Sequence, residues 1–80
     1  MKYACHCCGY LTHSSPPVGT YEICPVCFWQ EDAVQSDDPS YLGGANQVSL
    51  AQARSNFATY GACEEAAREF VRPPLPDELP

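Results

Sequence analysis

A length of eighty residues limits this chain to one small domain, and the hydrophobic core of such a domain gives only marginal stability by itself. Four basic and ten acidic residues give a formal net charge of −6, which excludes a broad basic face for a phosphate backbone. We therefore expect no nucleic-acid binding. The chain has no apolar run long enough to cross a bilayer and no apolar leader at its start, so we expect a cytoplasmic protein without membrane contact.

The composition of residues 1–29 predicts a zinc ribbon with two short hairpins. Residues 10–12 and 20–23 favour β-strands, and the serine-, proline- and glycine-rich residues 13–19 predict a loop between them. The aromatic side chains expected to cover one face of this unit are those of Tyr10, Tyr21, Phe28 and Trp29.

Two CxxC turns lie within this ribbon. Cys5 and Cys8 form the first turn, Cys24 and Cys27 form the second, and fifteen residues separate the two pairs. A CxxC turn places two sulfur atoms on one side of a tight loop, and two such turns supply the four corners of a tetrahedron. In a reducing cytosol this pattern favours metal binding over disulfides. We predict a closed Zn²⁺ site with Cys5, Cys8, Cys24 and Cys27 as ligands.

Other side chains near the turns have alternative roles. Cys7 can compete with either cysteine of the first turn, although the two-residue spacing favours the outer pair. Cys63 is most simply a buried small apolar residue, and a disulfide between Cys7 and Cys63 is the alternative. His6 and His13 can ligate zinc, but with four cysteines already assigned we expect both at the surface.

Residues 30–47 predict an irregular acidic loop, interrupted by Pro39 and by a pair of glycines. A solvated connector is the simpler interpretation, and a partner-binding loop anchored by Trp29 and Tyr41 is the alternative. The acidic pairs match neither a calcium loop nor an acid/base pair, and a four-cysteine shell leaves no open coordination position, so we expect no catalytic residues. The four acidic residues, expected in solvent, are Glu31, Asp32, Asp37 and Asp38.

Residues 48–72 predict a helical half. Ser49 can cap a helix over 50–60, and Gly61 follows it where a left-handed residue is favoured. A second helix is predicted over 64–71. The side chains expected in the core are Leu50, Ala53, Phe57 and Tyr60 from the first helix and Ala66, Ala67, Phe70 and Val71 from the second.

Residues 73–80 form a proline-rich tail, which we expect to be extended because Pro73 and Pro74 cannot continue a helix. The favoured interpretation is a strap across the protein's own helices, anchored by Leu75. The alternative is a proline-rich ligand for an aromatic groove of another protein.

Segments along nearly the whole chain resemble one known family. They are residues 7–12, 21–29, 43–44, 46, 49–50, 53–54, 56–57, 61–64 and 71–74. On these residues the chain resembles the bacterial cysteine-rich CPCC family, and the resemblance implies a compact one-domain bacterial protein without specifying an activity. His6 stands where the family motif has proline, and it adds an N–H group and a further potential ligand.

A weaker similarity is to rubredoxin, through Cys-Gly-Tyr at 8–10 and Cys-Pro-x-Cys at 24–27. It implies iron as the alternative metal, and an electron carrier or thiol redox protein as the alternative function. The spacer is shorter than in rubredoxin, and Phe28 stands where a glycine is expected.

Taken together, the sequence predicts a small α+β protein with zinc-ribbon or rubredoxin-like knuckles (1–29), an acidic loop (30–47), a part with two short helices (48–72) and an extended tail (73–80). We expect a single zinc-stabilised, non-enzymatic interaction domain over 1–80. Its acidity suggests a basic protein partner, and one version is an inhibitor or immunity-type protein that masks a basic toxin. The sequence does not specify the oligomeric state.

Overall fold

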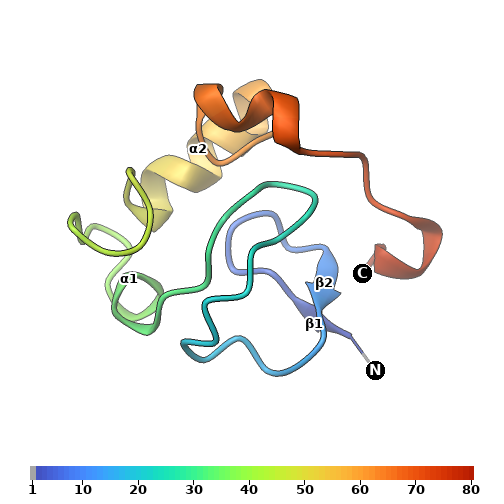
Figure 1. The fold of residues 1–80 in the computed structure, drawn as a ribbon, viewed down its shortest axis with the longest axis horizontal. Helices are drawn as coiled ribbons and strands as arrows, with labels where there is room; N and C mark the ends of the chain where they lie inside the picture. The colour runs from blue at the N-terminus through green and yellow to red at the C-terminus, as the bar shows by residue number, and fades with distance from the viewer. Residues whose placement is uncertain (1) are drawn as a thin grey trace.

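A computed structural model describes residues 2–80 as a small α+β fold (Figure 1). Strands β1 (Tyr3–Ala4) and β2 (Leu11–His13) pair as an antiparallel hairpin, with Tyr3 opposite His13. Two α-helices follow, α1 (Ala33–Asp37) and α2 (Leu50–Tyr60). Two short 3₁₀ helices complete the chain, η1 (Glu65–Phe70) and η2 (Pro76–Glu78). Over the described residues, no helix has the length and apolar character needed to span a bilayer.

Helix α2 has the boundaries that its capping residues predict. The Ser49 hydroxyl accepts a hydrogen bond from the Gln52 amide, and Gly61 ends the helix at φ +77°. Leu50 and Ala53 are buried as expected. Tyr60, by contrast, is exposed, so its prediction as a core residue is wrong.

The second predicted helix is shorter and tighter than expected. It is the 3₁₀ helix η1, which begins after Glu64 without a side-chain cap and lies beside α2 (Figure 1). A six-residue segment without a cap gains little from α-helical bonds, and 3₁₀ geometry is usual for such short pieces. Only Ala67 of its predicted core side chains is buried, because Ala66 and Phe70 are exposed and Val71 is half-buried.

The predicted strand over 20–23 is wrong. Tyr21 adopts a left-handed backbone conformation at φ +58°, which no extended strand accommodates. What remains is an isolated bridge between Ile23 and Gln30, with a hydrogen bond from the Tyr21 amide to the Glu31 carbonyl. The second hairpin is therefore a tight turn with few ladder bonds.

The acidic segment is more ordered than its composition predicts. Asp32 caps helix α1 by accepting from the amides of Val34 and Gln35, and its second oxygen accepts from Ala45. These bonds, the one from Ala45 first, hold the pKa of Asp32 below its usual range. The prediction that all four carboxylates are solvated is wrong for Glu31 and Asp32, which are buried, and holds for Asp37 and Asp38.

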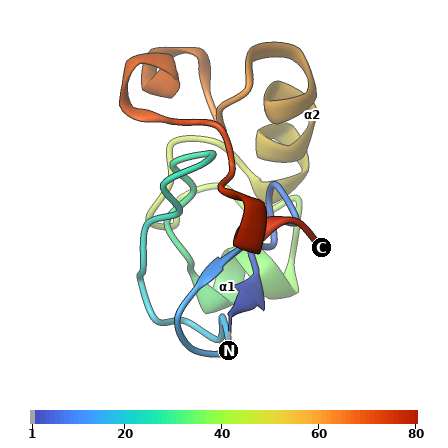
Figure 2. The same cartoon turned by 90° about the vertical axis from the view of Figure 1, so that its right-hand side faces the viewer.

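The tail is anchored by a different residue than expected. Leu75 is 46% exposed, whereas Glu78 is buried and accepts two hydrogen bonds from the Arg72 guanidinium at 2.8 and 2.9 Å. The chain runs from η1 back to the β-hairpin, where η2 lies against β2 (Figure 2). Lys2 pairs with Asp77 at 3.2 Å and extends this contact. The tail therefore straps the hairpin rather than the helices, and it is not extended throughout.

Candidate metal centre

Two turns of the same geometry build the site, and we call residues 5–10 the first knuckle and residues 24–29 the second knuckle. In the first knuckle, the Gly9 amide donates to the Cys5 carbonyl and the Cys5 amide donates to the Tyr10 carbonyl, both at 2.9 Å. The second knuckle repeats this pair: Phe28 N–H to Cys24 O at 2.8 Å, and Cys24 N–H to Trp29 O at 2.9 Å. Each turn therefore holds its two sulfurs on one side by backbone bonds alone.

The residue after the last cysteine of each knuckle is left-handed. Gly9 has φ +81° and Phe28 has φ +71°. Glycine adopts this conformation at no steric cost, whereas a bulky side chain there is a genuine outlier. Phe28 therefore takes the backbone role of a glycine, the residue that the similarity to rubredoxin leads one to expect at this position.

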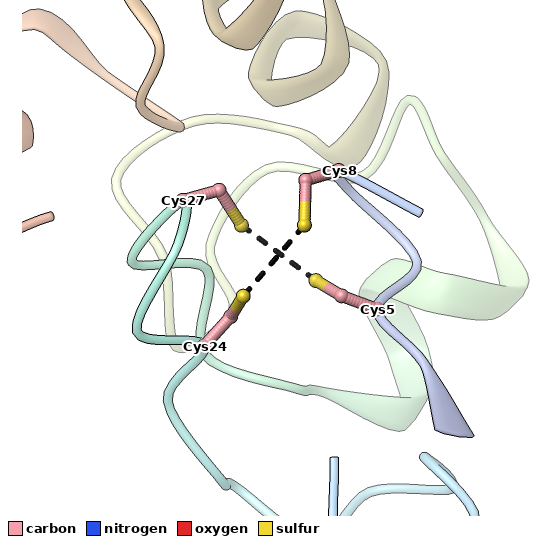
Figure 3. Close-up of side chains that lie close together, drawn as sticks. All are labelled: Cys5, Cys8, Cys24 and Cys27. Carbon is pink, nitrogen blue, oxygen red and sulfur yellow. Dashed lines mark hydrogen bonds between the residues drawn. The ribbon is translucent and has the colours of Figure 1, made fainter. Parts of the chain in front are cut away.

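The four cysteine side chains converge from the two knuckles (Figure 3). Their sulfur atoms all lie within 4.8 Å of one another, with Cys5 and Cys27 Sγ 3.6 Å apart and Cys8 and Cys24 Sγ 3.7 Å apart. Three of the four side chains are buried and Cys8 is half-buried. The structure thus brings together every residue that the sequence analysis assigned to the site.

This donor set fits a tetrahedral ion. Bonds of about 2.3 Å from zinc to each thiolate imply sulfur–sulfur separations of about 3.8 Å at ideal tetrahedral angles. The Cys5–Cys27 and Cys8–Cys24 pairs, at 3.6 and 3.7 Å, are near that value. The four cysteines can therefore hold a metal ion, and a tetrahedral thiolate site is compatible with either zinc or iron.

The electrostatics of the cluster centre on Cys24. Hydrogen bonds from the Cys27, Cys5 and Cys8 thiols hold the pKa of Cys24 well below its usual range. The same hydrogen bonding to Cys24, with burial, raises the pKa values of the other three thiols. A divalent cation replaces these shared protons and lets all four sulfurs ionise together.

Two further groups contact the sulfurs. The Thr12 hydroxyl lies 3.0 Å from Cys24 Sγ, and the Trp29 amide donates to Cys27 Sγ at 3.5 Å. Hydrogen bonds of this kind stabilise negative charge on thiolates and orient them toward the ion. The sequence indicates Thr12 only as a strand residue, because its contact with Cys24 of the second knuckle depends on the folded structure.

Cys7 and Cys63 lie outside the four-sulfur cluster. Both are buried, and both are free thiols, so the alternative of a disulfide between them is not realised. Burial raises the pKa of the Cys63 thiol to about 12, which leaves it protonated and weakly reactive. Cys63 is thus a small buried residue, as expected.

His6 has a structural role that the sequence did not reveal. Its Nδ1 lies 2.9 Å from Glu31 Oε1 and 2.9 Å from Ser36 Oγ, and the Ser36 hydroxyl donates to Glu31 Oε2 at 2.7 Å. Glu31 is fully buried, and a buried carboxylate needs such partners. His6 therefore joins the first knuckle to helix α1, across a sequence distance that no local pattern reports.

His13 and Trp29 lie where the sequence did not place them. His13 was expected at the surface but is fully buried, with Nδ1 3.5 Å from Glu22 Oε1. Trp29 is also fully buried, so it cannot anchor a partner as the binding-loop alternative requires. Tyr41, the second proposed anchor, is exposed. Whether a strand or knuckle residue is buried depends on the segments that pack over it, and a short-range sequence pattern does not identify those segments.

The profile of the Cysteine-rich CPCC family matches residues 3–78. The chain belongs to this family. The match extends from β1 to η2, so the two knuckles, the helices and most of the tail lie within the family's common region. No curated protein matches the chain. His6 occupies the proline position of the motif that gives the family its name, and in this member the histidine serves to pair with buried Glu31.

Proposed function

We propose that the four cysteines hold Zn²⁺ as a closed structural site, and that the protein is a non-enzymatic module that binds a basic protein partner. The observation that carries the first part is the convergence of four sulfurs within 4.8 Å of one another. Four thiolates complete the tetrahedral shell and leave no position for a substrate or a reactive water. The buried sulfurs suit a site that supports folding.

The distribution of charge supports the basic partner. Three of the four cationic side chains already bind groups of the protein itself: Lys2 binds Asp77, Arg72 binds Glu78, and Arg54 donates to the His6 carbonyl. Within residues 2–80, the exposed carboxylates of Asp37, Glu65 and Glu69 form no ion pair. Four thiolates around one Zn²⁺ add about −2 to the formal charge. An acidic inhibitor of a basic toxin is one function of this kind.

Metal analysis of the natively purified protein tests the first part. We expect one zinc per chain and a colourless sample, and a chelator should unfold the protein as it removes the metal. A red sample containing iron would instead favour the alternative function, a rubredoxin-like electron carrier.

The second part of the proposal, the basic partner, is tested by affinity for proteins of the native host at two salt concentrations. Recovery of a basic partner whose affinity falls with salt supports it, and failure to recover one contradicts it.

A further inference from the structure

Half-buried Phe28 of the second knuckle and exposed Phe70 form an aromatic pair. The ring centroids lie 5.3 Å apart with an interplanar angle of 25°, and Phe70 is 59% exposed. Phe28 stays in this pair although its backbone is left-handed, where the first knuckle has Gly9. A glycine would satisfy the turn without strain, so the turn itself does not require the phenyl ring.

A small cavity of about 110 Å³ is lined in part by Phe28. Its apolar lining includes Ile23, Val48 and Cys63, and its polar lining consists of Gln30, Asn46, Gln47 and Glu64. An apolar cavity of about 150 Å³ holds a benzene molecule, so this smaller space suits one aliphatic side chain better than an aromatic one. Ile23 is itself 46% exposed and extends the apolar surface outside the cavity.

Carboxylates occur in the cavity lining and on the helix that follows it in the chain. Glu64 lines the cavity, and Glu65 and Glu69 are exposed on η1, the element that carries Phe70. Arg68 is the basic residue of the same element, so the local balance is three carboxylates against one guanidinium. The backbone of Cys63 also donates to the Cys27 carbonyl at 2.7 Å, which places the cavity beside the thiolate cluster. A segment bound here contacts the apolar side chains of the cavity and lies close to carboxylates.

We propose that this surface binds a cationic peptide segment of another protein, with one aliphatic side chain in the cavity and its lysine or arginine side chains over Glu64, Glu65 and Glu69. The complementarity is twofold, because the cavity fits a branched alkyl group and the rim attracts positive charge. The inference rests on the proposed function for the basic character of the partner, and it adds the surface and the residues that bind it.

The probe is the acetylated peptide amide Lys-Lys-Leu-Lys-Lys, titrated into the metal-loaded protein and followed by amide chemical shifts. We expect the shifts to centre on residues 23, 28, 48 and 63–70. A peptide with glycine for leucine should bind about tenfold more weakly, the equivalent of losing one buried aliphatic side chain. A peptide with glutamate for lysine should not bind.

Matched variants test the surface itself. Phe70→Ser and Ile23→Ser should weaken binding of the leucine peptide several-fold, and the carboxylate variant Glu64→Gln/Glu65→Gln/Glu69→Gln should remove its salt dependence. Val18→Ser and Asp37→Asn/Asp38→Asn change exposed residues elsewhere and should leave binding unchanged. Because Phe70 and Ile23 are exposed, an unchanged melting temperature separates a loss of binding from a loss of fold.

The possible outcomes separate the two proposals. Binding that centres on residues 37–38, or that survives Phe70→Ser and Ile23→Ser, overturns this surface and leaves the basic partner in place. No binding of the leucine peptide at millimolar concentration also overturns the proposed binding surface. The proposal of a basic partner is tested separately, by recovery of such a partner from the native host. A concentration-dependent dimer that Phe70→Ser dissociates would assign the face to a second copy of the chain and overturn the inference.

Discussion

The two knuckles share a backbone but differ in nearly every side chain between and after their cysteines. Both close with the same two hydrogen bonds, and both place a left-handed residue after the second cysteine. The carbonyl that follows the first cysteine accepts from an arginine in each case: His6 from the Arg54 side chain at 2.8 Å, and Pro25 from the Arg72 amide at 3.2 Å. The shared parts are those that position sulfur atoms.

The differing parts serve the rest of the fold. His6 of the first knuckle binds Glu31, whereas Pro25 at the equivalent place of the second cannot donate. In the last position, Trp29 is fully buried, while its equivalent Tyr10 is half-buried and contacts the ring of Phe57 edge-on. The geometry of the metal site thus fixes the backbone of both knuckles, while their side chains between and after the cysteines can differ. The first knuckle binds α1 through His6, and the second knuckle contributes more side chains to the core, including Val26 and Trp29.

Loss of a ligand tests whether the two knuckles contribute equally to the site. Cys24→Ser and Cys8→Ser each remove one thiolate, and we expect both proteins to lose the metal and most of their secondary structure. The reason is that apparent zinc-binding energies of about 10–16 kcal/mol match or exceed the roughly 5–15 kcal/mol net stability of a domain. Metal content and circular dichroism melting measure the effect.

Cys7→Ser is the matched control, because Cys7 is buried in the first knuckle but lies outside the sulfur cluster. It should keep the metal and a cooperative melting transition. A Cys8→Ser protein that keeps both the metal and the fold would show that half-buried Cys8 is dispensable, and would break the equivalence of the two turns.

Replacement of His6 by proline makes the first knuckle resemble the second. The backbone should tolerate it, since Pro25 occupies the equivalent position. Buried Glu31 then loses a partner, and we expect a cost of about 1–3 kcal/mol in the free energy of unfolding, with metal content unchanged. Urea denaturation of the metal-loaded protein measures it. In a Glu31→Gln background the cost should shrink, and an equal cost there would assign it to the backbone instead.

The sequence predicts the parts of this molecule that depend on short-range chemistry. The four-cysteine pattern and the caps of α2, Ser49 and Gly61, are local signals, and the structure brings those cysteines together and begins and ends α2 at those caps. The burial of Glu31 and Trp29 depends on segments that are distant in the chain. Asp32 was predicted to be solvated from its charge, which missed both its local role as the N-cap of α1 and its bond from Ala45, thirteen residues away. Charge alone therefore gives the wrong burial for two of the four acidic side chains in the loop, Glu31 and Asp32.

The left-handed position offers a finer comparison of the knuckles. An added Cβ at Gly9 meets no atom within 4 Å, so Gly9→Ala should cost only the backbone penalty, about 1 kcal/mol. In the second knuckle, Phe28→Gly removes this backbone penalty, whereas Phe28→Ala keeps it. We expect Phe28→Ala to be less stable than Phe28→Gly by a similar amount, measured by urea denaturation with excess metal. Equal stabilities of the two variants would mean that the second turn relaxes to a different backbone.

The smallest expected effect concerns the ion pair between Arg72, whose amide binds the second knuckle, and Glu78 of the tail. Hydrogen bonds from Arg72, then from the Leu75 amide, lower the pKa of buried Glu78 to about 2 from an ordinary 4.5. A carboxyl with a depressed folded-state pKa stabilises the fold above the unfolded pKa and loses that contribution as the pH falls toward the folded value. The stability difference between the wild type and Glu78→Gln should therefore be constant from pH 8 to roughly pH 5.5 and shrink at lower pH. Because Arg72 also donates its amide to Pro25 and η2 lies against β2, hydrogen exchange should show the 72–78 segment loosening in Glu78→Gln while helix α1 stays protected. Equal loosening of α1 would mean that the tail supports the whole fold and not only the hairpin and the second turn.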